Sequence, residues 1–172
     1  MRLYRARAWR GMGRPTFDAL DSSGTIAGPT GWRFNDLSTE ILYTAEVEAL
    51  AVLEVAVRPG FDTIRQILIA TINVPDGAIV DLSDLGIVLP SNWNARPVAD
   101  ESRTIAREFL DVVAAMPAAT PKPVGVRVPS VLSGSDRNVL LDPSRKAEYS
   151  AAISNRIPFE YLRDTGSQRG LI

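Results

Sequence analysis

The chain has 172 residues, a net charge of −1 at pH 7, and 45% hydrophobic and 23% charged residues, which is the ordinary composition of one globular domain with its own core. It contains no cysteine and no histidine, so disulfides, thiolate nucleophiles, Ser-His-Asp triads and His- or Cys-ligated metals are excluded. The nearly neutral charge argues against nucleic-acid binding by this chain alone, because a phosphate backbone requires a basic surface.

Strands and helices alternate irregularly along the chain. After an extended start at residues 2–9, branched and aromatic content predicts strands at residues 40–43, 64–75, 77–82, 124–132, 137–143 and 157–162. Helical spacing predicts helices at residues 44–57, with Thr44 as the N-cap, and at residues 99–116 and 143–155. The clustered strands indicate an α+β fold: a single domain over residues 1–172 with a mixed β-sheet core and flanking helices.

The basic start of the chain, MRLYRARAWRGMG, is followed by no apolar stretch, so we expect no signal peptide. No apolar run is long enough to span a bilayer. We therefore expect a cytoplasmic protein that does not enter a membrane.

Glu54 lies inside the apolar run ALAVLEVAV, on a helix that we expect to be largely buried. An ionised carboxylate in such a place is costly unless it is paired or hydrogen-bonded. Two interpretations stay open: a structural glutamate that pairs with an arginine or turns to the helix edge, and a catalytic or ligand-binding carboxylate at the floor of a pocket.

Arg33 lies between two aromatic residues, Trp32 and Phe34. Its guanidinium can stack on aromatic rings and offer a rigid fork to a phosphate or carboxylate, although a surface arginine with its stem on apolar neighbours is the commoner case. Tyr43, an ordinary aromatic at a strand end, can approach Glu54 if it belongs to the strand before the helix. Within one helix the two residues would be about 16 Å apart, and only a long ligand would reach both.

Ser130 and Asn138 flank the polar turn SGSD. If their strands pair around Gly134 and Ser135, these two residues fall one position out of register, so a bulge or a sheet edge is needed to direct both side chains the same way. Either residue could also serve the turn itself.

Five motifs in order, GWRFN, LYTAE, ALAVLE, VPSVL and NVLLDP, together resemble the RES domain, the toxin of bacterial RES–Xre toxin–antitoxin pairs, a family named for an Arg, a Glu and a Ser. The motif-bearing core covers about residues 2–155, and a polar C-terminal tail follows from about residue 163. Three residues depart from the family pattern: Phe34 stands for Trp, Asp142 for Asn, and Arg145 for a frequent His.

The resemblance implies a fold similar to ADP-ribosyltransferases and a site that binds NAD⁺ as substrate, with no bound cofactor and no metal. Carried over by motif, the catalytic residues are Arg33, Tyr43 and Glu54, and NAD⁺ is bound by Arg33, Tyr43, Ser130 and Asn138. An arginine suits the pyrophosphate, an aromatic face suits the cationic nicotinamide, and a carboxylate suits the oxocarbenium-like ribose.

The activity that the resemblance implies is depletion of NAD⁺ by cleavage of the nicotinamide–ribose bond, through hydrolysis or phosphorolysis. ADP-ribosylation of a protein target and an inactive partner-binding domain are the alternatives. The expected partner is an Xre-like antitoxin that covers the active-site cleft and supplies the DNA contact, in a dimer or a larger toxin–antitoxin assembly.

Overall fold

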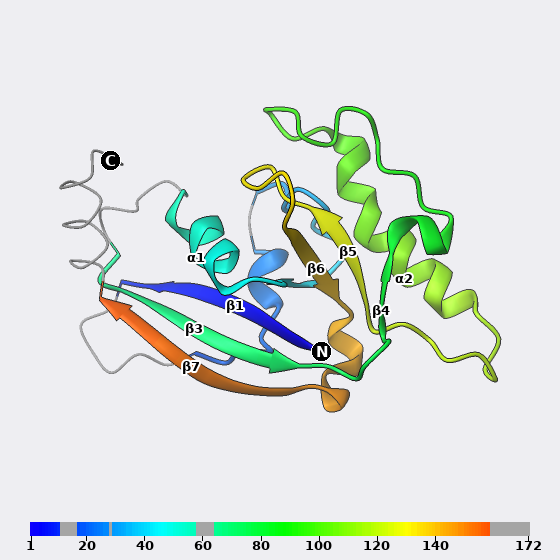
Figure 1. Ribbon diagram of the computed structural model, residues 1–172. Helices are drawn as coiled ribbons and strands as arrows, with labels where there is room; N and C mark the ends of the chain where they lie inside the picture. The colour runs from blue at the N-terminus through cyan, green and yellow to red at the C-terminus, as the bar shows by residue number, and fades with distance from the viewer. Residues whose placement is uncertain (11–16, 28, 58–63, 159–172) are drawn as a thin grey trace.

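The computed structural model describes residues 1–10, 17–27, 29–57 and 64–158. Within these residues, seven strands form one mixed sheet in the order β4-β5-β6-β2-β1-β3-β7 (Figure 1). The strands are β1 (Arg2–Trp9), β2 (Leu42–Ala45), β3 (Gln66–Asn73), β4 (Ile79–Asp81), β5 (Gly125–Pro129), β6 (Arg137–Leu141) and β7 (Ser150–Pro158). Neighbouring strands are antiparallel except β4 and β5, which are parallel. The predicted α+β class with a mixed sheet is confirmed.

Two α-helices, α1 (Glu48–Ala56) and α2 (Ile105–Ala115), cover the same face of this sheet. The strand register places Tyr4, Ala45, Asn138 and Val128 side by side, and hence on one face. On that face α1 packs over β1 and β3, and α2 packs over β5 and β6. Figure 1 shows α1 above β1, with α2 on the side of β5. The part of the face between the helices belongs to β2.

The opposite face is closed by a second core. Leu3, Leu42, Ile72 and Val139 meet there in one fully buried group. Tyr149, which follows the 3₁₀ segment Pro143–Glu148, completes this core. Its hydroxyl proton is shared between the carbonyls of Asp142, at 2.8 Å, and Val124, at 3.2 Å. The same strands thus have an apolar support on the side away from the helices.

The sheet opens between β1 and β2. These strands pair at one register position, Tyr4 opposite Ala45. Beyond it β1 continues in register with β3, while β2 is paired with β6. The two central strands therefore part from each other, and a gap forms between two well-supported halves of one sheet.

The predicted helix at residues 44–57 begins later than expected. Thr44 is not its N-cap: it lies buried in β2, and its Oγ1 donates to the Val139 carbonyl at 2.9 Å, while Val47 precedes the first helical residue. The backbone of Thr44 is committed to pairing with β6, which overrides the capping preference of its side chain. The helix is also less buried than expected, because Leu53 is 40% and Val57 is 52% exposed.

The predicted helix at residues 143–155 is wrong beyond its first turns. The segment Pro143–Glu148 is 3₁₀ helix, with Asp142 Oδ1 accepting from the Ser144 amide. From Ser150 the chain enters β7 and pairs along the whole of β3, since a neighbouring strand edge satisfies the backbone better than the local helical preference of two alanines. The last strand, predicted at residues 157–162, thus starts at Ser150, and positions 159–162 lie outside the described residues.

The remaining predicted elements are confirmed with shifts of a few residues at their ends: the extended start, the strands at β2, β3, β4, β5 and β6, and the helix at α2, which follows the 3₁₀ segment Asp100–Thr104. In the described part of the chain, no helix combines the length and apolar character needed to cross a membrane.

Candidate functional site

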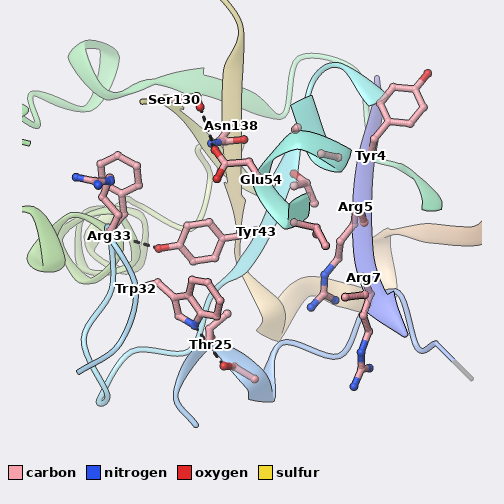
Figure 2. A pocket seen from close by; sticks show the side chains of 18 of the residues that line it. Tyr4, Arg5, Arg7, Thr25, Trp32, Arg33, Tyr43, Glu54, Ser130 and Asn138 are labelled. Carbon is pink, nitrogen blue, oxygen red and sulfur yellow. Dashed lines mark hydrogen bonds between the residues drawn. The ribbon is translucent and has the colours of Figure 1, made fainter. Parts of the chain in front are cut away.

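A cavity of about 460 Å³ lies where β1 and β2 part, and this volume is within the usual range of small-molecule sites. Its walls come from β1, β2, α1, the loop before β2 and the connection between β5 and β6. All five residues predicted from the sequence line it: Arg33, Tyr43, Glu54, Ser130 and Asn138 (Figure 2). Segments up to about a hundred positions apart in the chain thus converge on one site.

Glu54 reaches the cavity from α1 and is held by two hydrogen bonds. Its Oε1 accepts from the Ser130 hydroxyl at 2.9 Å and from Asn138 Nδ2 at 2.7 Å. Ser130 Oγ in turn accepts from the Leu132 amide at 3.0 Å, so the hydroxyl proton is directed toward Glu54. Ser130 and Asn138 are buried, and together they fix one oxygen of a carboxylate on the cavity wall.

The offset expected between Ser130 and Asn138 is wrong. In the hairpin Val128 faces Asn138 and Pro129 faces Arg137, so the turn is centred on Ser133, and Ser130 follows Val128 by two positions. Two positions along an extended chain return a side chain to the same face, and no bulge is needed. The turn is tightened by Ser133, whose Oγ donates to Asp136 Oδ2 at 2.8 Å and accepts from the Asp136 amide at 3.1 Å.

Tyr43 lies on β2, the strand before α1, and therefore can share a site with Glu54. Its hydroxyl accepts from the Phe34 amide at 3.0 Å and donates to Asn35 Oδ1 at 3.0 Å. The ring of Trp32 lies 6.4 Å from the Tyr43 ring, centroid to centroid, at an angle of 47°. The two rings give the cavity an aromatic wall, as Figure 2 shows.

The loop that carries Trp32 depends on Gly31. This glycine has φ +75°, and a Cβ atom there would overlap the backbone of Asn35 and Asp36. The Trp32 amide donates to the Asn35 carbonyl at 2.9 Å across the resulting turn. The glycine that begins the GWRFN motif therefore has a backbone reason to be there.

Arg33 borders the cavity, but its guanidinium also supports a neighbouring loop. Its Nη1 donates to the carbonyls of Trp93, at 2.6 Å, and Ala95, at 3.2 Å. Burial and the nearby charge of Arg96 lower the pKa of Arg33 from its usual value, while Glu54 and Tyr43 act in the opposite direction. In Figure 2 it stands beyond Tyr43, away from β1.

The aromatic neighbours of Arg33 in the sequence do not form one sandwich. Trp32 turns to Tyr43, whereas Phe34 is buried and stacks on Trp93, with ring centroids 6.3 Å apart. The loop around Trp93 is thus fastened twice, by Phe34 and by the Arg33 guanidinium. We conclude that at least one nitrogen of Arg33, Nη1, stabilises the loop around Trp93.

Three arginines of β1 and its end, Arg5, Arg7 and Arg10, line the cavity and were not singled out from the sequence. We call them the basic wall. Arg5 and Arg7 leave β1 on the same side in Figure 2, as residues two apart on a strand must, and both guanidinium carbons lie near the Phe17 ring, at 5.7 and 6.0 Å. The spacing of Arg5 and Arg7, two positions apart within the predicted strand, is the signal that would have found these two.

Asp21 lies beside the basic wall. Hydrogen bonds from the hydroxyl and amide of Ser23 hold the pKa of the Asp21 carboxyl below its usual value, and Arg5 and Arg7 contribute in the same direction. Arg5 is oriented by a bond from its Nη1 to the Ala19 carbonyl at 2.8 Å. One end of the cavity is therefore cationic, and the other carries Glu54.

The described residues include no cluster of side chains that could ligate a metal ion. Among residues 1–10, 17–27, 29–57 and 64–158, no three acidic side chains gather closely enough to hold a metal ion. The groups that face the cavity are suited to an organic ligand with an anionic part and a flat part.

Comparisons with known proteins identify similar sequences. The model of the RES domain matches residues 2–164. A protein named Toxin Res from Photorhabdus laumondii is 32% identical over 125 residues, covering 72% of this chain and 74% of that protein. A Toxin Res from Yersinia enterocolitica is 26% identical over 165 residues, 95% of this chain and 93% of that protein. A protein named Prs ADP-ribosylating toxin, from a Sphingobium species, is 30% identical over 133 residues, 75% of this chain and 76% of that protein.

Proposed function

The chain belongs to the RES domain family, and from this premise we propose that its cavity binds NAD⁺ and cleaves the nicotinamide–ribose bond, so that the protein depletes NAD⁺ as a toxin. One observation carries the proposal: a single cavity has a fixed carboxylate beside two aromatic rings at one end and a basic wall at the other. NAD⁺ has the same polarity, a flat cationic nicotinamide riboside joined to an anionic pyrophosphate.

The nicotinamide end is assigned to Trp32, Tyr43 and Glu54. A cationic ring is attracted to the faces of aromatic side chains, and Trp32 and Tyr43 present two such rings. When the glycosidic bond breaks, its electron pair moves to the nicotinamide nitrogen and positive charge develops on the ribose. A carboxylate fixed next to the ribose stabilises that charge, and this is the role we propose for Glu54.

Ser130 and Asn138 act through Glu54 in this proposal. Both donate to the same carboxylate oxygen, which prevents the side chain from turning away from the ribose. Such preorganisation is worth more than a direct but mobile contact, because the charge is already in place when the transition state forms. We propose this positioning role in addition to contacts with the ribose or the carboxamide.

The pyrophosphate end is assigned to Arg5 and Arg7. Guanidinium groups bind phosphate oxygens through charge-assisted hydrogen bonds, and these two stand on the far side of Tyr43 from Arg33. We propose that Arg33, expected at the phosphate, instead lies beside the reacting end, and the influence of Glu54 and Tyr43 on its pKa supports this. There it shapes the wall and contributes positive charge near the carboxylate.

The decisive experiment is nicotinamide release from NAD⁺ by the full chain, followed by chromatography. We expect turnover by the wild type and a loss of about 10²–10³-fold in kcat for Glu54→Gln, the usual cost of one preorganised electrostatic group. Glu48→Gln is the matched control, because it makes the same change on the same helix outside the cavity lining. Full turnover by Glu54→Gln would refute the assignment, and no turnover or NAD⁺ binding by the wild type would leave a partner-binding domain.

ADP-ribosyl transfer to a protein is the second candidate, favoured by the Sphingobium relative, whose name describes it as ADP-ribosylating. The same bond breaks, but a protein side chain takes the place of water or phosphate as acceptor. Mass spectrometry of a cell extract incubated with NAD⁺ and the protein separates the two reactions. Free ADP-ribose without a modified protein supports hydrolysis, and a modified protein supports transfer.

We further propose an Xre-like antitoxin as the partner that covers the cavity. In support, Leu53, Val57 and Val131 are exposed apolar residues on the two elements that carry Glu54 and Ser130. An antitoxin seated there would block NAD⁺ entry. Adding the purified antitoxin should therefore suppress nicotinamide release, and unchanged release in a stable complex would place the antitoxin elsewhere.

A further inference from the structure

Asn35 is the most completely buried polar side chain near the cavity. Its side chain is fully excluded from solvent. The two protons of its Nδ2 are shared among the carbonyls of Asp36 and Thr39, both at 2.9 Å, and of Thr25, at 3.1 Å. A buried amide with these partners is fixed in one orientation, because only the NH₂ group can face carbonyl oxygens.

This fixed orientation determines the state of the Tyr43 hydroxyl. With Nδ2 facing three carbonyls, Oδ1 of Asn35 must face Tyr43, at 3.0 Å, and an amide oxygen can only accept. The single hydroxyl proton of Tyr43 is therefore directed to Asn35. The Phe34 amide donates to the same hydroxyl oxygen at 3.0 Å, so the hydroxyl is held from both sides by the loop that carries Trp32.

We propose that Asn35 is a positioning residue: it anchors Tyr43 through the hydroxyl so that the ring face, and not the hydroxyl, serves the substrate. The Tyr43 hydroxyl then takes no part in proton transfer. The same anchoring fixes the angle between the rings of Tyr43 and Trp32, because Phe34 and Asn35 lie only two and three positions after Trp32 in the same loop. This inference rests on the proposed function, since the rings would hold the nicotinamide of NAD⁺.

The test compares Tyr43→Phe, Asn35→Ala and the double variant in nicotinamide release by the full chain. A ring that binds the ground state affects KM, so we expect each single variant to raise KM about tenfold, as for the loss of one buried hydrogen bond, with kcat within about twofold. Because both residues act through one bond, the double variant should be no worse than Asn35→Ala alone. Asn155→Ala, on the exposed strand β7, is the control and should leave KM unchanged.

A different pattern would overturn the inference. If the hydroxyl reacted, Tyr43→Phe would lower kcat about a hundredfold or more with KM unchanged and would remove the alkaline limb of the pH–rate profile. Additive effects in the double variant would equally refute the coupling through Asn35.

Two further measurements keep the test interpretable if a variant does not fold or the wild type is inactive. Hydrogen exchange at the Phe34 amide should quicken in Tyr43→Phe, which reports the anchor without any substrate and carries the test if Asn35→Ala does not fold; unchanged exchange would contradict the anchor. A wild type that neither binds nor cleaves NAD⁺ refutes the proposed function and this inference together, whereas an active wild type with a kcat defect in Tyr43→Phe refutes this inference alone.

Discussion

Arg7 gives the sharpest test of how the cavity is oriented. Its side chain is exposed at the basic wall, near the Phe17 ring and Asp21, so replacing it with glutamine should change folding stability by no more than about 0.5 kcal/mol. A charge-assisted hydrogen bond to a phosphate is worth about 1.5–3 kcal/mol. Arg7→Gln should therefore raise KM for NAD⁺ about 10–100-fold. We expect kcat to stay close to the wild-type value, because Glu54, to which we assign the chemical step, lies at the other end of the cavity.

The assay for Arg7 is steady-state nicotinamide release with two substrates. Nicotinamide riboside has the reacting bond but no pyrophosphate, so its turnover should be the same in Arg7→Gln and in the wild type. Arg2→Gln is the matched control, since Arg2 is also exposed on β1 but does not line the cavity. A normal KM for NAD⁺ in Arg7→Gln, or equal losses with both substrates, would refute the placement of the pyrophosphate at the basic wall.

Two further predictions concern the supports of the site. Arg33→Lys should lower stability by about 1–3 kcal/mol, because the lysine side chain is one bond shorter and its ammonium falls short of the position of Nη1, which donates to the Trp93 and Ala95 carbonyls. Thermal denaturation measures this, and an unchanged Tm would refute a structural role. Burial raises the pKa of Tyr149 above its usual value of 10.0, so the unfolded chain loses this proton first and stability should fall as the pH rises above about 10, by at most about 1.4 kcal/mol per pH unit. Urea denaturation between pH 8 and pH 11 checks the slope, and a slope equal to that of Tyr149→Phe would show that Tyr149 does not cause it.

Local patterns predicted the fold well wherever the backbone followed side-chain chemistry. The strands around Ile67 and Val126 and the helix around Phe109 were placed because their apolar spacing matches their burial. The errors occurred where pairing with a distant strand decided the conformation. Threonine is a good helix cap, but Thr44 lies within β2 and its backbone pairs with β6. Ser150 begins a strand only because the edge of β3 is available for pairing.

The sequence predicted which residues line the candidate site, but not how their side chains are arranged. The family pattern identified Glu54, Tyr43, Ser130 and Asn138, and the structure brings their side chains to one cavity. That both hairpin residues bind the same carboxylate oxygen could not be predicted, because the register depends on the turn at Ser133. A shift of a single position in that turn would have turned one side chain to the other face.

The basic wall was overlooked for a compositional reason. The chain has 19 basic residues and all but two, Lys122 and Lys146, are arginine, so an arginine in β1 is not unusual by itself. Arg5 and Arg7 differ from the other arginines because they lie where β1 is no longer paired with β2. This position depends on the topology of the sheet, which the sequence does not show.

The gap between β1 and β2 explains why a ligand-sized cavity can exist in so small a domain. A continuous sheet would pair every backbone group of these strands and leave no room for a ligand. Here β1 is supported by β3 and α1, and β2 by β6, so each strand keeps a paired edge after they part. The cavity then receives groups from both halves: the arginines from one, and Tyr43 with Asn138 from the other. Glu54 comes from α1, which packs on β1 yet bonds to the hairpin of β5 and β6 through Ser130 and Asn138. The hydrogen-bonded carboxylate is therefore also a contact that spans the gap, and its position in the cavity is set by both halves of the sheet at once.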